Sequence, residues 1–268
     1  MDSRDYQQVL INDVRKSIVK HNSVMLQLGT GGGKTVIATF MMGGMIKRNY
    51  KAFFVCHRQE LIEQTAKTFN KMGMPYGYIA SGNPPNPFQP IQICSIDTLK
   101  SRLNKLPESC KPDFIIWDEA HHISADGWAK VKRYFSGAKH IGLSATPERL
   151  DGKGLDEHFD DMCLGPTVAE LMKHGHLSDY KMYCPGVPNL DGVNKSGGDY
   201  TRSALASAMM EQRAIVGDIV RHWQKHAQGK KTVGFAASVN HSKMICAQFE
   251  RKGVNALHLD GNTPKAER

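Results

Sequence analysis

Short apolar runs alternate with longer stretches of helical spacing along the first half of the chain. Helices are predicted from Tyr6 to Lys20 and from Lys34 to about Lys47, and a third is predicted around Leu61, Thr65 and Phe69. Buried strands are predicted at Val24–Leu28, Ala52–Cys56, Ile91–Ser95, Phe114–Trp117 and His140–Leu143. Because strands and helices alternate, the pattern predicts an α/β fold with one doubly wound parallel sheet.

The second part of the chain has a different pattern. Residues Pro185–Tyr200 are rich in Gly, Pro, Asn and Asp, which predicts an irregular excursion, and a helical stretch follows from Arg202 to Gln228. A strand at Thr232–Ala236, a helix at Val239–Lys252 and a strand at Ala256–Leu259 are then predicted. We therefore expect one domain over residues 1–180, a linker and helical segment over 181–229, and the start of a further domain over 230–268.

Composition narrows the class of protein. The chain has 268 residues and a formal net charge of +9, which favours a polyanionic partner such as nucleic acid. Its six cysteines are scattered without the paired spacing of zinc sites or disulfide frameworks, so reduced thiols are expected. No apolar run approaches the roughly 20 residues that span a bilayer, and the N-terminus lacks the apolar core of a signal peptide. We therefore expect a soluble cytoplasmic protein with no membrane partner.

A glycine-rich segment, Leu28-Gly-Thr-Gly-Gly-Gly-Lys-Thr35, lies between a predicted strand and a predicted helix. Backbone N–H groups in such a turn surround phosphate oxygens, and the N-terminus of the following helix favours negative charge. Lys34 would reach the β- and γ-phosphates of a nucleotide, and the Thr35 hydroxyl would bind Mg²⁺. Leu28 stands where the usual pattern has Gly, and the alternative is an ordinary glycine-rich turn with an incidental Lys-Thr pair.

Two carboxylates follow the apolar run Ile115-Ile116-Trp117. Asp118 and Glu119 emerge at the carboxyl end of this predicted strand, where parallel α/β sheets bind their ligands. Asp118 could hold Mg²⁺, and Glu119 could orient and deprotonate an attacking water. An Asp-Glu pair in this position is otherwise a helix cap beside a solvated acid, but the preceding phosphate loop favours a catalytic pair.

These motifs and several others, in a fixed order, resemble those of superfamily 2 helicases. Asp118-Glu119-Ala120-His121 is similar to the DEAH box, and Ser144-Ala145-Thr146 resembles motif III. His57–Leu61 resembles motif Ia, Ser95–Thr98 resembles motif Ib, and Arg4–Gln7 resembles the adenine-recognising element. The stretch Leu143–Leu155 most resembles the RadD-like group of DNA helicases. The resemblance covers nearly the whole chain and implies a RecA-like P-loop NTPase domain followed by an incomplete second RecA-like domain.

The resemblance also implies roles for individual residues. Lys34, Asp118, Glu119 and His121 would be catalytic, and Thr35 and Asp118 would hold Mg²⁺. Ser144 and Thr146 would couple phosphate release to domain movement. His57, Arg58 and Thr98 would contact nucleic-acid phosphates, although these residues could instead cap a strand or start a helix. The residues implied in ATP binding are Arg4, Gln7, Gly29, Thr30, Gly31, Gly32, Gly33, Lys34 and Thr35.

The last part of the sequence resembles the opening of a second motor domain, with Phe235–His241 at the position of motif IV. Motifs V and VI, which include the arginine finger of these helicases, do not occur in the sequence. Because removing an arginine finger lowers turnover by roughly 10³–10⁵-fold, we expect weak ATP hydrolysis from this chain by itself. Another chain or segment would then supply the rest of the second motor domain.

The leading hypothesis is an ATP-dependent DNA helicase or translocase, with DNA favoured over RNA only through the resemblance. Two alternatives stay open. One is the translocase subunit of a restriction-type complex, whose nuclease would be another chain because no nuclease carboxylate–lysine cluster is evident. The other is a non-catalytic module that binds ATP and nucleic acid without turnover.

Overall fold

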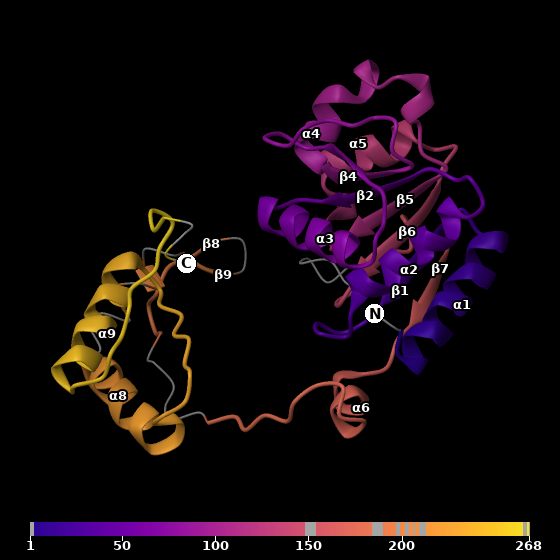
Figure 1. Cartoon of the computed structure of the whole chain (residues 1–268). Coiled ribbons are helices and arrows are strands. Elements are labelled where there is room, and N and C mark those ends of the chain that lie inside the picture. Colours follow the sequence, from indigo (N-terminus) through magenta and orange to yellow (C-terminus); the bar gives the residue numbers. More distant parts are fainter. Residues whose placement is uncertain are drawn as a thin grey trace. The chain divides into compact units, whose positions relative to one another are not determined.

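The computed structural model describes residues 3–147, 154–183, 190–196, 199–201, 204–205, 207–208, 213–264 and 267. The chain divides into two compact units, Met1–Asp179 and Tyr180–Arg268 (Figure 1). Within the described residues, no helix combines the length and the apolar character that crossing a bilayer requires. Residues 148–153, which belong to the stretch that resembles the RadD-like group, lie outside the described residues.

The first unit is built around a seven-stranded sheet in which every neighbouring pair of strands is parallel. The strands are β1 Ser23–Gln27, β2 Ala52–Cys56, β3 Gly77–Ile79, β4 Ile91–Ser95, β5 Phe114–Asp118, β6 Lys139–Ser144 and β7 Asp161–Leu164. The α-helices are α1 Asp5–Lys20, α2 Lys34–Ile46, α3 Gln59–Lys71, α4 Ile96–Arg102, α5 Asp126–Tyr134 and α6 Val168–Lys173. Short 3₁₀ turns occur at Leu103–Lys105, Glu108–Cys110 and Ala120–Ser124.

The strand order is β3-β4-β2-β5-β6-β1-β7. Strand β6 pairs with β1 on one side and with β5 on the other. Because all these strands are parallel, their carboxyl ends lie at one edge of the sheet, and the segments that follow β1, β6 and β5 are neighbours there.

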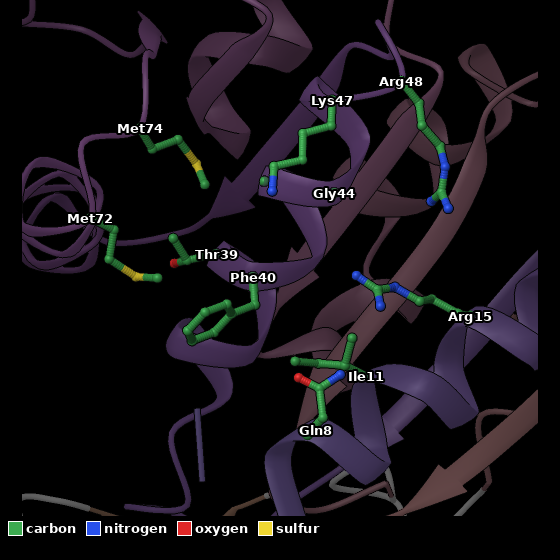
Figure 2. Close-up of a pocket in the computed structure, with 11 residues that line it drawn as sticks. Gln8, Ile11, Arg15, Thr39, Phe40, Gly44, Lys47, Arg48, Met72 and Met74 are labelled. Atoms are coloured by element: carbon green, nitrogen blue, oxygen red, sulfur yellow. The ribbon is translucent and has the colours of Figure 1, made fainter. Parts of the chain in front are cut away.

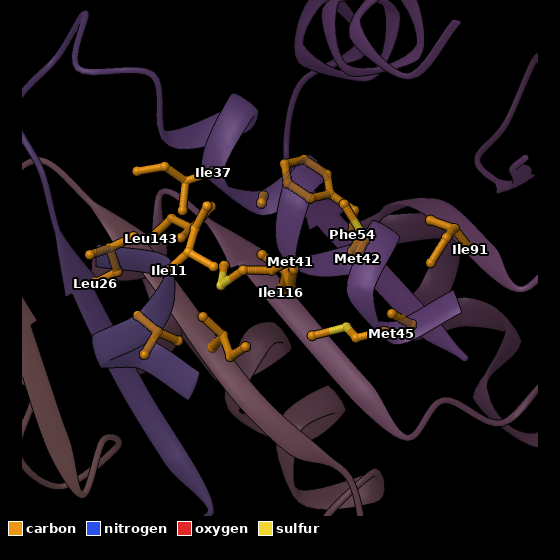
Figure 3. Packing of buried hydrophobic residues seen from close by; sticks show 14 of the residues in the cluster. Ile11, Leu26, Ile37, Met41, Met42, Met45, Phe54, Ile91, Ile116 and Leu143 are labelled. Carbon is orange, nitrogen blue, oxygen red and sulfur yellow. The ribbon is translucent and has the colours of Figure 1, made fainter. Parts of the chain in front are cut away.

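Helices cover both faces of the sheet, because alternate residues of each strand point to opposite faces and most of them are apolar. On one face α1, α2 and α3 enclose a cluster that includes Leu26, Phe54 and Ile116 (Figure 3). On the other face α4 and α5 enclose a cluster that includes Phe53 and Trp117. The predicted α/β fold with a doubly wound parallel sheet is therefore confirmed.

The predicted strands of the first unit agree with β1, β2, β4, β5 and β6 to within one residue at each end. Strands β3 and β7 were not predicted. Both are short and lie at the two edges of the sheet, and β7 exposes Met162 and Leu164. A short edge strand buries few side chains, so the sequence carries little of the alternation that would reveal it.

The second unit contains helices α8 Arg213–Ala227 and α9 Val239–Arg251 and a small antiparallel pair, β8 Lys195–Ser196 with β9 Asp199–Tyr200. The two helices pack on each other through Trp223 and Phe249, whose ring centroids are 5.5 Å apart. Parts of the predicted excursion (185–189 and 197–198) and of the predicted helical stretch (202–203, 206 and 209–212) lie outside the described residues.

The strands predicted at Thr232–Ala236 and Ala256–Leu259 are wrong, since neither segment pairs with another strand in the described part of the chain. Their apolar side chains face solvent: Phe235 is 95% exposed and Leu257 is 83% exposed. A strand needs neighbours for its backbone N–H and C=O groups and cover for its apolar faces. The apolar runs are present in the sequence, but a local pattern does not reveal whether a neighbouring strand is available for pairing.

Candidate functional site

The glycine-rich loop connects the end of β1 to the start of α2. The Leu28 N–H donates to the carbonyl of Ser144 over 2.9 Å, so the loop begins beside the end of β6. Gly31 and Gly33 have φ angles of +82° and +88°, which side chains rarely adopt. At Gly33 a Cβ atom would also lie 2.5 Å from the Gln7 side-chain nitrogen. The loop conformation therefore requires glycine at these positions.

Lys34 and Thr35 form the first turn of α2. The Lys34 ammonium donates to the carbonyl of Leu28 over 3.3 Å, so it reaches back across the loop. Helix α2 starts at the loop and has no acidic residue in its first turn, so unpaired N–H groups and the positive end of the helix dipole face the loop. This arrangement suits an anion with several oxygen atoms.

The segment Arg4–Gln7, which resembles an adenine-recognising element, lies directly against the loop. Gln7 is buried, and its side-chain amide donates to the Gly32 carbonyl over 3.1 Å and accepts from the Arg4 N–H over 3.0 Å. The Tyr6 hydroxyl donates to the same Gly32 carbonyl over 2.7 Å. The exposed Arg4 side chain reaches the Tyr6 hydroxyl over 3.4 Å. Sequence reasoning did not select Tyr6, although it lies inside the quoted Arg4–Gln7 element.

Asp118 ends β5 and is 7% exposed. Burial, followed by the neighbouring Glu119 carboxylate, raises the pKa of Asp118 to about 6, while Lys34 acts in the opposite direction. Glu119 follows in the left-handed region at φ 51° and ψ 51°. Such a conformation costs a non-glycine residue of order 1 kcal/mol and is often retained at functional sites. Burial of the Asp118 charge and the left-handed backbone of Glu119 therefore each lower the free energy of unfolding.

Replacing Asp118 by Asn is expected to stabilise the protein at pH 8. A carboxyl pKa raised from 3.8 to about 6 corresponds to about 3 kcal/mol of free energy of unfolding, lost as the pH rises through 6. The neutral amide has no such charge to bury, so the advantage of the variant should be largest at pH 8 and absent below pH 4. Urea denaturation of both proteins at pH 8, 6 and 4 measures this difference. Equal stability at pH 8, or a difference independent of pH, would contradict the prediction.

His121 links the Asp118-Glu119 segment to the end of β6. Its Nδ1 atom lies 3.2 Å from the Ser144 hydroxyl and 3.4 Å from a Glu119 carboxylate oxygen. The Ser144 hydroxyl donates to the Thr146 carbonyl over 2.6 Å. Glu119, His121, Ser144 and Thr146 therefore form a continuous polar chain between the segments that follow β5 and β6.

A second group of rings surrounds the end of β2. The rings of His57 and His122 have centroids 4.9 Å apart, and those of His122 and Trp128 are 5.9 Å apart. The exposed Arg58 donates to the ring of His57 over 3.1 Å. Burial, followed by the Arg58 charge, lowers the pKa of His57. The structure therefore places the nucleic-acid candidates His57 and Arg58 at the same sheet edge as Glu119, with the ring of His122 between them and His121.

Thr98, the third nucleic-acid candidate, lies in α4 and is buried. Its hydroxyl accepts a hydrogen bond from the Ser81 N–H over 3.2 Å, and its carbonyl accepts one from Ser101. Contact between this hydroxyl and a phosphate would require the Ser81 bond to be released. In this structure Thr98 holds the start of the loop that follows β3.

The oxygen donors at the loop suit Mg²⁺. Thr35 offers a hydroxyl and Asp118 a buried carboxylate, and magnesium typically takes one or two carboxylates with waters and phosphate oxygens. A cation beside Asp118 would also offset the cost of burying its charge. Among the described residues, no cluster of His, Cys, Asp and Glu side chains that could enclose a metal ion is present. The donor set is consistent with a magnesium ion held jointly by the protein and a nucleotide.

A cavity of about 600 Å³ lies elsewhere, between α1 and α2 and near the end of α3 (Figure 2). Apolar side chains such as Phe40 and Met74 line it together with Arg15, Lys47 and Arg48. None of the glycine-loop residues and neither Asp118 nor Glu119 lines it. The candidate site is thus an open edge of the sheet and not this cavity.

Comparison with known proteins identifies a matching family and several relatives. The family described as type III restriction enzyme, res subunit, matches residues 1–149. A 51.5 kDa protein of Lactococcus phage (isolate 7-9) is 30% identical over 244 residues, which cover 91% of this chain and 50% of the relative. The DNA 3'-5' translocase XPB2 of Sulfurisphaera tokodaii is 29% identical over 187 residues, which cover 68% of this chain and 39% of the relative. The chain thus spans half of the phage protein and a smaller share of the translocase.

Among solved structures, the chain is similar to the ATP-dependent type ISP restriction-modification enzyme LlaBIII bound to DNA, with a TM-score of 0.63 and 16% identity. The match covers 94% of this chain and 21% of that enzyme, and at this identity it concerns the fold alone. Residues 1–149, matched by the family, contain the glycine-rich loop, the Asp118-Glu119 pair and the Ser144–Thr146 segment. The chain therefore belongs to the type III restriction enzyme res subunit family, and with it to the superfamily 2 helicases.

Proposed function

We propose that the protein binds and hydrolyses ATP and couples this reaction to movement along nucleic acid, as a superfamily 2 helicase or translocase. One observation supports this most strongly. The glycine-rich loop, the Asp118-Glu119 pair and the Ser144–Thr146 segment follow the adjacent strands β1, β5 and β6, and so converge at one edge of the sheet. Groups that would bind phosphate, activate water and couple phosphate release to domain movement are thereby brought together from positions far apart in the sequence.

The proposal gives each of these side chains a role. The loop N–H groups and Lys34 would bind the phosphates, and Gln7, whose amide donates to the Gly32 carbonyl of the loop, would contact the adenine. Thr35 and Asp118 would hold Mg²⁺, which would neutralise charge on the phosphates. Glu119 orients the attacking water and accepts its proton. Because His121 contacts both Glu119 and Ser144, a movement of the Glu119 side chain during hydrolysis would shift the segment that follows β6.

DNA is the proposed nucleic acid. The resemblance of Leu143–Leu155 to the RadD-like group favours it, as does the similarity of the chain to a protein named as a DNA translocase. The net charge of +9 suits a polyanion, and Arg58 is an exposed cation beside the ATP site. Contacts of this type would be to backbone phosphates and would fix the position of the strand without reading its bases.

Arg58→Ala is expected to weaken binding of single-stranded DNA and to lower its salt dependence. If two to four phosphates are neutralised, the affinity of the parent protein for single-stranded DNA should fall roughly seven- to fiftyfold between 50 and 200 mM salt. Removing one phosphate contact should reduce the slope of log K against log salt by about 0.7 on single-stranded DNA. Fluorescence anisotropy with a labelled oligonucleotide measures both. Arg48→Ala, two residues beyond the end of α2, is the matched control. An equal effect of both substitutions would contradict the proposed contact of Arg58 with DNA phosphates.

The test of the proposed function is ATP hydrolysis with and without single-stranded DNA, duplex DNA and RNA. Turnover that is stimulated by DNA and lost in Lys34→Ala would support a DNA-dependent motor. Stimulation by RNA alone would replace DNA by RNA in the proposal. ATP binding with no turnover under any condition would favour the non-catalytic module.

A translocase acting inside a restriction-type complex is the second candidate. It is favoured by the similarity of fold to a type ISP restriction-modification enzyme over 94% of this chain. In either case we infer that residues 230–268 begin a second RecA-like motor domain, after a linker and helical segment over 181–229. The exposed apolar segments on either side of α9 support this, because strands supplied by another segment or chain would cover Phe235 and Leu257.

A further inference from the structure

A segment that no motif identified lies against the outside of the glycine-rich loop. Residues 165–177, here called the clamp, follow β7 and include α6. They lie beyond the residues 1–149 that the family matches. They belong to the same compact unit as the loop, and the second unit begins at Tyr180, three residues after Leu177.

The clamp touches the loop at alternate glycines. A Cβ atom on Gly29 would lie 3.0 Å from a methyl group of Val168, and one on Gly31 would lie 2.7 Å from a methyl group of Leu177. These branched side chains therefore occupy the space that any side chain at those loop positions would need. Val168 is itself 45% exposed, so burial in the main core does not explain its position.

A third contact reaches the loop through the adenine-recognising element. The ring of His176 lies against the ring of Tyr6, with centroids 5.0 Å apart, and the Tyr6 hydroxyl holds the carbonyl of Gly32. Gly29, Gly31 and Gly32 are thus each contacted, directly or through Tyr6, by a residue of the clamp. These contacts join positions more than 130 residues apart.

The clamp is anchored to the sheet by its own local structure. The Gly165 N–H donates to the Gln27 carbonyl over 2.8 Å, which continues the pairing of β7 with β1. Leu171 is fully buried in the core cluster of α1 and α2. The chain then reverses at Gly175, with φ +69°, and the N–H groups of His176 and Leu177 both donate to the Leu171 carbonyl. The side chains that touch the loop therefore stand on a fixed support.

We propose that Val168, His176 and Leu177 are positioning residues that hold the glycine-rich loop in the conformation that binds nucleotide. A loop rich in glycine has many accessible conformations, and binding selects one of them. The apparent affinity falls in proportion to the fraction of molecules in the competent conformation. By restricting the loop from outside, the clamp raises that fraction without touching the nucleotide. The inference depends on the proposed ATP site.

The test is ATP binding by Leu177→Ala and by the double variant Val168→Ala, Leu177→Ala. Titration calorimetry with Mg²⁺ present measures the dissociation constant of each variant. The dissociation constant should rise roughly tenfold in the single variant and further in the double variant. Leu177→Met, which keeps the volume of the side chain, should restore binding to within about threefold of the parent. Leu164→Ala removes a leucine that is 66% exposed at the end of β7 and should leave the affinity unchanged.

Amide hydrogen exchange separates positioning from a general loss of structure. In Leu177→Ala the amides of residues 29–35 should exchange faster, while those of β5 and β6 keep the exchange rates of the parent. Faster exchange throughout the sheet would overturn the proposal, as would unchanged ATP affinity in the double variant. If the parent binds ATP and Lys34→Ala does not, unchanged affinity in the clamp variants overturns the clamp alone. If the parent shows no ATP binding, both the clamp and the proposed function are wrong.

Discussion

Glu119→Gln is expected to lower ATP turnover by roughly 10²–10⁴-fold while leaving ATP affinity within about threefold of the parent. Glutamine matches glutamate in size and can keep the left-handed backbone conformation at this position, but it cannot accept a proton from water. Glu119 is partly exposed at the sheet edge and lies within 3.4 Å of His121, so its carboxylate is available to a water molecule. The variant should therefore bind nucleotide and fail at the chemical step.

Steady-state hydrolysis and calorimetry on the same preparation separate the two quantities. Glu108→Gln is the matched control, because Glu108 pairs with Lys111 on the surface and lies in another segment. Its turnover should equal that of the parent. Turnover of Glu119→Gln within threefold of the parent would mean that another group acts as the base, and Asp118 would then be the first to examine.

Lys34→Ala is expected to weaken ATP binding by roughly 10²-fold or more. Hydrogen bonds between an ammonium group and phosphate oxygens each contribute about 1.5–3 kcal/mol, and the alanine variant loses all of them. In this structure Lys34 donates to the carbonyl of Leu28, a local hydrogen bond, so its removal should change the melting temperature little. The loss of affinity should therefore appear in a protein that is still folded.

Calorimetric titration with ATP and Mg²⁺, together with thermal unfolding, measures both effects. Lys47→Ala is the matched control, because it removes an exposed lysine just beyond the other end of α2. Saturable binding by Lys34→Ala at the affinity of the parent would contradict the assignment of the glycine-rich loop as the phosphate site.

Local sequence determined most of the first unit. Strands β2 and β4 coincide with the predicted runs, because a buried parallel strand is apolar along its whole length and stands out between polar segments. In α3 the predicted stripe is also found, with Thr65 and Phe69 buried, although Leu61 is only partly buried. The glycine-rich loop and the acidic pair could be located as well, since their chemistry depends on residues adjacent in the chain.

The nucleic-acid candidates were less predictable. His57 and Arg58 lie at an open edge, whereas Thr98 faces the protein interior and binds the Ser81 N–H. A motif places a residue along the chain but does not determine which way its side chain points. The same limit explains the strands wrongly predicted at Thr232–Ala236 and Ala256–Leu259, because pairing depends on a neighbour that local sequence does not describe.

What the sequence determined by itself is the alternation of strands and helices, the glycine-rich loop, the acidic pair and the family to which these motifs belong. The tertiary structure decided which strand ends are neighbours, and so brought Ser144 beside His121 and Lys34 near Asp118. It also decided that Val168, His176 and Leu177 lie against the loop. The physical reason is the range of the interactions involved. Hydrogen bonding within a helix and the apolar pattern of a strand are local, whereas strand order and packing between distant segments arise only when the whole sheet forms.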